Sequence, residues 1–204
     1  MAGIESVPDY PGLPLARFLE MVASREPAPG GGASAAVAVA LAAALAGMAA
    51  RFSTEHLAEA ESLAGKADEL RGRALPLARA DAAAYGRVLD AYRNPRDDEA
   101  GRRRRIREAL SGAADVPLSI AEIGAEVAGI SARLAEEGNP NLRGDAVTAA
   151  VLAGAGVRAA VTLVEINLRA AGAEDDRLSR AREFLAATAA SQEVVEGAGA
   201  RGAS

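Results

Sequence analysis

The sequence predicts an all-α protein, one compact domain over residues 1–204 built as a bundle of about six to eight helices. Half of the residues are hydrophobic but only 3% are aromatic, and much of the apolar content is alanine. Alanine is the best helix former, and small side chains let helices approach closely. Apolar residues recur at helical spacing, whereas β-branched or aromatic runs of strand length are hard to find.

The first half of the chain contains three helical segments. Residues 13–23 carry apolar residues at helical spacing and end at a proline- and glycine-rich turn. The next helix begins in the glycines that follow and extends to about residue 53, with small residues on all sides. Residues 57–92 form either two helices or one bent helix, because Pro76 interrupts the apolar repeat.

The second half is divided by equally clear turns. Asn94-Pro95 and the acidic residues 97–99 predict a turn and a new helix start, with the arginine run 102–105 on that helix. Three further helices are expected over residues 116–137, 145–171 and 175–195. We expect the ends, residues 1–12 and 197–204, to be flexible.

Charge and composition narrow the function classes. The net charge of −5 offers no general attraction for nucleic acid or anionic membranes. The arginine run follows three acids and has no interleaved aromatic residue, so a solvated helix is favoured over a phosphate or nucleic-acid site. With no cysteine and only His56 as histidine, the sequence predicts no disulfide and no metal site.

The same features predict a cytoplasmic protein without a membrane span. The first 14 residues lack the basic, apolar and small regions of a signal peptide. Residues 33–50 are uncharged but dominated by alanine, which gains little from transfer to lipid, so we interpret them as a buried core helix. The broad apolar faces are hard to cover within one small domain, and a homodimer is the expected solution.

The turn Pro27-Ala28-Pro29-Gly30-Gly31-Gly32 is the sharpest chemical feature. Residues without side chains let a ligand approach the backbone, and the free N–H groups at a helix N-terminus favour an anion. The turn lacks the Lys-Ser/Thr ending of a phosphate-binding loop and the strand that precedes a dinucleotide-binding turn. On these grounds a structural connector and a ligand site are equally compatible with it.

Asp81 lies in a helix between alanines, where desolvation would raise the pKa of its carboxyl group. A carboxyl group tuned upward can exchange protons near neutral pH, as a general acid or base must. The alternative is a solvated residue paired with Arg79 or Arg87.

Two further polar groups interrupt apolar segments. Asn139, Asn141 and Asp145 are suited to hydrogen-bond a heterocyclic ligand, although capping of the next helix alone would explain them. Glu165 and Asn167 lie in an otherwise apolar stretch, and a buried asparagine needs partners from the protein or from a ligand.

Five short segments, in order, resemble the family of formiminotetrahydrofolate cyclodeaminases and methenyltetrahydrofolate cyclohydrolases. They are Pro27-Ala-Pro-Gly-Gly-Gly-Ala-Ser34, Asp81-Ala-Ala-Ala-Tyr85 with Ala91-Tyr-Arg-Asn-Pro95, Val116-Pro117-Leu118, Gly138-Asn-Pro-Asn141 with Asp145, and Ile166-Asn167-Leu168. The resemblance covers most of the chain. It implies a dimeric helical domain that binds folate between the glycine-turn helix and the Asp81 helix.

The resemblance also implies an activity and a site. The enzyme would cyclise 5-formimidoyltetrahydrofolate to 5,10-methenyltetrahydrofolate with release of ammonia, using no metal and no cofactor beyond the folate substrate. Asp81 would be the general acid–base. The predicted substrate-binding residues are Gly30, Gly31, Gly32, Ser34, Asn139, Asn141 and Asp145.

Two alternatives remain open. The first is methenyltetrahydrofolate cyclohydrolase activity, in which water attacks the methenyl carbon. The second is a catalytically silent dimer that binds folate or a partner protein. The second rests on departures from the family pattern: Ala33 replaces a serine, Gly144 replaces a serine, and Ser53-Thr54-Glu55-His56 replaces a segment of the Thr-x-Gly-Lys type.

Overall fold

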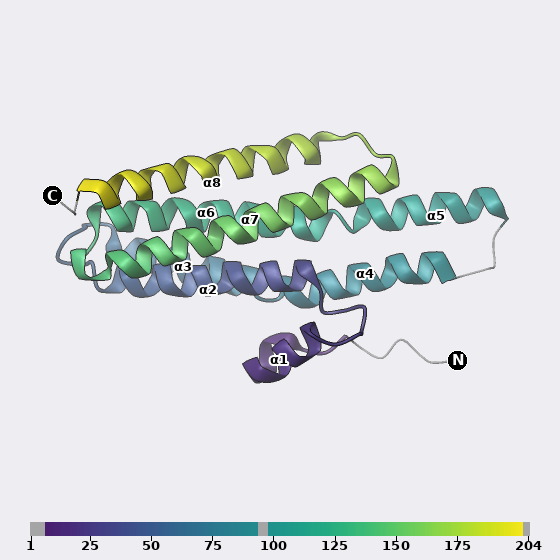
Figure 1. The fold of residues 1–204 in the computed structure, drawn as a ribbon, viewed down its shortest axis with the longest axis horizontal. Coiled ribbons are helices and arrows are strands. Elements are labelled where there is room, and N and C mark those ends of the chain that lie inside the picture. The colour runs from purple at the N-terminus through teal and green to yellow at the C-terminus, as the bar shows by residue number, and fades with distance from the viewer. Residues whose placement is uncertain (1–6, 94–97, 202–204) are drawn as a thin grey trace.

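The computed structural model describes residues 7–93 and 98–201, and within them every regular element is a helix, with no strand (Figure 1). The all-α prediction is confirmed. Eight α-helices and two short 3-10 helices are present in the described residues: η1 (Tyr10–Gly12), α1 (Leu15–Val22), α2 (Gly31–Arg51), α3 (Ala60–Ala74), α4 (Leu77–Arg93), α5 (Glu99–Gly112), α6 (Asp115–Glu137), η2 (Pro140–Leu142), α7 (Arg143–Ala171) and α8 (Asp176–Arg201).

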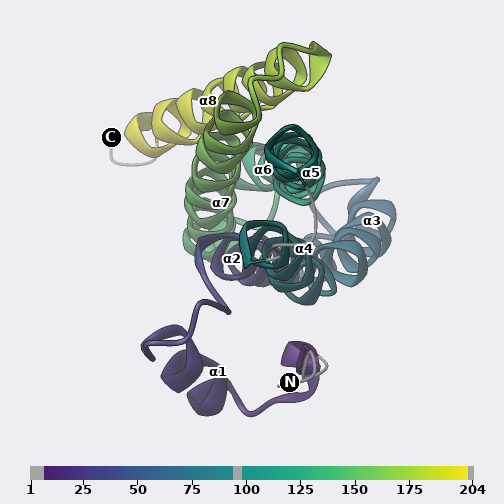
Figure 2. The ribbon, with the colours of Figure 1, turned by 90° about the vertical axis from the view of Figure 1, so that its right-hand side faces the viewer.

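The long helices run along one axis, and α2 lies between α7 and the pair α3 and α4 (Figures 1 and 2). It packs against α3, α4, α6 and α7. The chain breaks into α3 and α4 at Leu75 and Pro76, so the proline separates two helices, one of the two outcomes expected from the sequence. Helix α5 leads into α6 in the same end-to-end manner, and α7 and α8 complete the bundle.

Small residues make the central packing possible. Twelve of the 21 residues of α2 are buried, and most of these are alanine or glycine. Val39 of α2 fits against Gly124 of α6 and Gly156 of α7, where an added Cβ atom would lie 3.2 and 2.6 Å from its Cγ2 atom. Helices α6 and α7 therefore carry glycine at the points where the Val39 side chain of α2 packs against them.

Two segments in the described residues are long and apolar enough to span a membrane by composition alone, Gly31–Arg51 and Pro140–Ala171. In the folded chain, 61% of the apolar window in the first and 50% of that in the second are buried inside the bundle. Helix α2 is thus a core helix, as the sequence predicted.

The ends of the chain differ from the sequence expectation. Residues 10–12, expected to be loose, form η1, because the ring of Tyr10 is buried edge-on against Phe18 with 5.8 Å between the ring centroids. Helix α8 continues to Arg201, beyond the expected end at residue 195. The predicted turn at Asn94-Pro95 lies outside the described residues. The helix expected after it does begin at Glu99, with Asp98 as N-cap.

Candidate active site

Helix α2 begins without a cap of its own, because its N-cap residue is Gly30. The missing hydrogen bond comes from α4. The Ala33 backbone N–H donates to the Asp81 carboxylate at 3.1 Å, across 48 residues of sequence. A negative charge is favoured at this position, since the N-terminus of a helix carries partial positive charge and unpaired N–H groups.

Gly32 makes room for this contact. An added Cβ atom at Gly32 would overlap the Asp81 carboxylate, at a distance no two atoms reach without bonding. Gly30 and Gly31 are different: nothing crowds a Cβ atom at Gly30, and at Gly31 the nearest atom is Leu163 Cδ1 at 4.0 Å. Protein packing therefore explains the third glycine, whereas the first two border open space.

That open space is a cavity of about 260 Å³ beside the start of α2. It contains one ionisable carboxylate, that of Asp81, together with the Tyr85 phenol and the Asn167 amide. The full lining consists of Pro27, Ala28, Gly30, Gly31, Gly32, Asp81, Ala84, Tyr85, Ala113, Leu163, Ile166 and Asn167. The predicted glycine wall and the predicted acid–base residue thus face the same small, largely apolar cavity.

The surroundings of Asp81 adjust its proton affinity. Burial raises the pKa of the Asp81 carboxyl group, and the hydrogen bond from Ala33 N–H acts in the opposite direction but is the smaller effect. Among the described residues Asp81 makes no ion pair, so pairing with Arg79 or Arg87 is not observed. Helix η1 packs against α4, and burial and then the charge of Asp81 raise the pKa of the Tyr10 phenol.

One wall of the cavity comes from the junction of α5 and α6. The Asn167 side chain of α7 donates from Nδ2 to the Ala113 carbonyl at 3.2 Å, and both residues line the cavity. The sequence marked Asn167 as a buried amide in need of partners; the structure supplies one partner and leaves its oxygen unpaired among the described residues. Sequence reasoning missed Tyr85 as a cavity residue, although it lies one turn after Asp81.

Comparison with known proteins places the chain in a family. A sequence model of formiminotransferase-cyclodeaminase matches residues 14–195, nearly the whole chain. The chain belongs to the formiminotransferase-cyclodeaminase family.

Two similar proteins have names that fit this family. A methenyltetrahydrofolate cyclohydrolase of Methylorubrum extorquens is 34% identical over 192 residues, covering 87% of this chain and 91% of the relative. A formimidoyltransferase-cyclodeaminase of Sus scrofa is 36% identical over 165 residues, covering 76% of this chain but only 30% of that longer protein.

The fold agrees as well. The crystal structure of a formiminotetrahydrofolate cyclodeaminase from Thermotoga maritima superposes with a TM-score of 0.82 at 31% identity, covering 92% of this chain and 96% of that one. The relatives are thus enzymes of cyclohydrolase or cyclodeaminase type, and this member of the family is an enzyme of one of these types.

The other predicted binding residues lie elsewhere. The Ser34 hydroxyl donates to the Gly30 carbonyl at 2.9 Å and does not line the cavity. Asn139 lies at the opposite end of α2, where its N–H donates to Ser53 Oγ and its side chain donates to the Phe52 carbonyl, both at 2.9 Å. A helix of 21 residues is about 30 Å long, so these contacts lie far from Asp81 in the same chain.

Asn141 and Asp145 accompany Asn139 at that far end. The Asn141 N–H donates to Asn139 Oδ1 at 2.9 Å, which closes the η2 turn, and Asp145 occupies the first turn of α7. One folded chain therefore does not gather all the predicted substrate-binding residues, and the role of this cluster stays a prediction. His56 is exposed near the same end, and Arg51 pairs with Asp68.

No group of three or more acidic, histidine or cysteine side chains suited to a metal ion occurs in the part of the chain that the structure describes.

Proposed function

We propose that this protein is a folate one-carbon enzyme that closes 5-formimidoyltetrahydrofolate to 5,10-methenyltetrahydrofolate and releases ammonia. The observation that supports this most strongly is the Asp81 carboxylate, whose pKa is raised by burial and which faces a cavity at the start of α2. The match to a family named for cyclodeaminase, and the similarity in fold to a formiminotetrahydrofolate cyclodeaminase, support the choice of reaction.

Starting from the protonated formimidoyl group, the reaction requires one proton to move between two nitrogens. N10 attacks the formimidoyl carbon, which forms the new C–N bond, and the proton lost by N10 must reach the departing nitrogen. Asp81 takes this proton as a base and returns it as an acid, and the C–N bond to ammonia then breaks. A carboxyl group with a raised pKa suits both halves, and such a step contributes on the order of 100-fold or more in rate.

The backbone of the glycine turn has a separate task. In the first turn of α2, Ala33 N–H is used by Asp81 and Ser34 N–H by the Gly30 carbonyl. The N–H groups of Gly31 and Gly32 belong to the set that a helix start leaves free, and they border the cavity. We propose that they hold an oxygen of the folate while the absent side chains let its ring approach the backbone.

Methenyltetrahydrofolate cyclohydrolase activity is the second candidate. It is supported by the 34% identity to an enzyme of that name over 91% of its length. In this reaction Asp81 would take a proton from water as it attacks the methenyl carbon and return it to the ring nitrogen whose bond to that carbon breaks as the ring opens. The same carboxylate and cavity serve both reactions, because each passes through addition at the carbon between N5 and N10.

One experiment separates these hypotheses from a silent binding protein. The purified protein is incubated with 5-formimidoyltetrahydrofolate and, separately, with 5,10-methenyltetrahydrofolate, and the methenyl absorbance is followed. Appearance in the first reaction supports the cyclodeaminase, and faster disappearance in the second supports the cyclohydrolase. Asp81→Asn should lose at least about 100-fold in either activity while remaining folded. Silence with both substrates would contradict the proposed enzyme.

We also propose that the enzyme is a homodimer and acts in the cytoplasm. Leu41 on α2 and Val151 on α7 are 53% and 54% exposed, and residues 31–50 and 146–157 around them contain no charged side chain. A two-fold axis across the middle of α2 would place the Asn139 end of one chain beside the glycine turn of the other. That arrangement would bring the two separated halves of the predicted site together.

A further inference from the structure

The Ala113 carbonyl, just after the end of α5, lacks the backbone hydrogen bond that it would accept in a continuous helix. In a continuous helix this carbonyl would accept the N–H of residue 117, but residue 117 is proline and has no N–H. The Asn167 amide of α7 supplies the donor instead, at 3.2 Å. Asn167 therefore fills a gap that Pro117 leaves in the cavity wall.

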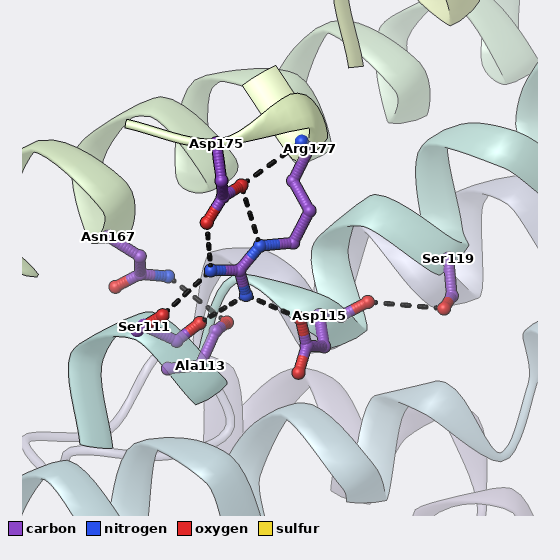
Figure 3. A network of polar contacts seen from close by, with 7 residues as sticks. All are labelled: Ser111, Ala113, Asp115, Ser119, Asn167, Asp175 and Arg177. Atoms are coloured by element: carbon purple, nitrogen blue, oxygen red, sulfur yellow. Dashed lines mark hydrogen bonds and ion pairs between the residues drawn. The ribbon is translucent and has the colours of Figure 1, made fainter. Parts of the chain in front are cut away.

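This contact determines which way the Asn167 amide faces. A carbonyl oxygen only accepts hydrogen bonds, so the NH₂ group must point toward Ala113 and the amide oxygen must point away from it. Figure 3 shows the oxygen on the side opposite Ala113. Among the described residues this oxygen has no partner, and Asn167 lines the cavity that contains Asp81.

Arg177, in the first turn of α8, holds the other side of this junction (Figure 3). Its guanidinium donates to the Ser111 carbonyl at 2.8 Å and to the Ser111 hydroxyl at 2.7 Å. It also donates to Asp115 at 2.6 Å and to Asp175 at 2.7 Å. Residues 111 and 115 flank Ala113, so one half-buried cation fixes the chain on both sides of the carbonyl that orients Asn167.

We propose that Asn167 is a specificity-determining residue whose amide oxygen accepts a hydrogen bond from an N–H group of the bound ligand, and that Arg177 is a positioning residue for it. This inference rests on the proposed function, because folates offer N–H donors at the pterin ring and at N10. The Asn167 amide oxygen would select ligands that present an N–H group to this wall of the cavity. This binding role is separate from the proton transfer by Asp81.

The first test removes the whole amide, both the acceptor and the donor to Ala113, while keeping the size of the side chain. Asn167→Leu should raise the Kd for 5-formyltetrahydrofolate, a stable folate, and the KM for substrate about tenfold, with kcat changed less than about threefold. The matched control is Thr162→Val, which removes an exposed hydroxyl bonded only to its own helix. Circular dichroism and the thermal midpoint establish that each variant is folded.

The second test separates positioning from stability. Arg177→Met should raise KM about threefold in the wild-type background and leave KM unchanged in the Asn167→Leu background, because its effect passes through Asn167. A loss of stability alone would act equally in both backgrounds. The control is Arg182→Met, which like Arg177→Met changes α8 and removes an exposed ion pair with Glu165 of α7; it should leave KM unchanged in both backgrounds.

The outcomes distinguish this inference from the proposed function. Binding of the folate by the wild type together with unchanged Kd in Asn167→Leu would overturn the role of Asn167 and leave the proposed function standing. Equal effects of Arg177→Met in both backgrounds would overturn the positioning role of Arg177. Failure of the wild type both to bind the folate and to turn over substrate would overturn the proposed function and, with it, this inference.

Discussion

At the scale of single residues, Asp81 combines two properties that usually conflict. Its carboxylate accepts the Ala33 N–H and so caps α2, which favours the ionised form. Burial favours the neutral form and is the larger effect on its pKa. The carboxylate is therefore held firmly in place by the helix while its proton affinity is raised by its surroundings. A residue that must both keep a fixed position and exchange a proton needs this combination.

Gly32→Ala tests how closely the carboxylate and the helix start are fitted. The new methyl group would overlap the Asp81 carboxylate, so the side chain must turn away and Ala33 N–H loses its partner. We expect a loss of about 1–3 kcal/mol in the free energy of unfolding, measured by urea denaturation, and loss of turnover. Gly30→Ala is the matched control, since nothing lies within 4 Å of its added methyl group, and its stability should be close to wild type. Equal stability of the two variants would contradict this account.

The pH dependence of stability provides a second test at Asp81. Because the pKa is raised in the folded state, the native protein binds more protons than the unfolded chain, and stability falls as pH rises through the folded pKa. Asp81→Asn removes this titration while its amide oxygen can still accept from Ala33. Urea denaturation should give equal midpoints for the variant and the wild type below about pH 4, and a higher midpoint for the variant at pH 8. A variant less stable at pH 8 would show that the charged cap outweighs burial.

At the scale of helices, close approach depends on where the glycines lie. Gly124 and Gly129 are both inside α6, but only Gly124 faces another helix closely. An added Cβ atom at Gly124 would lie 2.5 Å from Val157 Cγ2 and 3.2 Å from Val39 Cγ2, whereas nothing lies within 4 Å at Gly129. Gly124 therefore brings α6 against α2 and α7, while Gly129 gains nothing from lacking a side chain.

This difference predicts opposite effects for one substitution on one helix. Gly124→Ala should destabilise the protein by about 1–3 kcal/mol through overpacking. Gly129→Ala should stabilise it by about 0.5–1 kcal/mol, because alanine restricts the unfolded chain and favours the helix. Thermal and urea denaturation measure both, and adding Val157→Ala, which removes the nearer methyl group, to Gly124→Ala should recover part of the loss. Destabilisation by both single variants would show that helix packing does not decide the outcome.

The helices themselves could be predicted from the sequence because their signals are local. The break at Pro76 and the start of α5 at Asp98 each depend on a residue and its neighbours. The cavity could be predicted only in part. That Asp81 caps α2, and that Asn167 replaces the donor missing at Pro117, are contacts between residues 48 and 54 positions apart. Such contacts depend on how the helices pack, which periodicity does not encode.

At the scale of the whole molecule, the predicted site is divided between the two ends of α2. The glycine turn and Asp81 are at one end, and Asn139 with Ser53 is at the other. The resemblance that named both groups says nothing about distance, so the sequence could not reveal this separation. A single chain accounts for the Asn139 contacts as structural ones, because they join η2 to the end of α2. A dimer with its two-fold axis across α2 gives them a second use.

Val151→Glu is the corresponding test of the dimer. Val151 is 54% exposed on α7, and a glutamate placed there would have to be desolvated in an interface formed by α2 and α7, which disfavours association. Val194→Glu is the control, since Val194 is 39% exposed on α8, away from that face. Light scattering after size exclusion should give twice the mass of one chain for the wild type and the control, and the mass of one chain for Val151→Glu.

If the Asn139 end of one chain completes the cavity of the other, the monomeric variant should remain helical by circular dichroism but bind 5-formyltetrahydrofolate at least about tenfold more weakly. A monomeric wild type would rule out the dimer, and a monomeric variant with unchanged folate binding would confine the site to one chain.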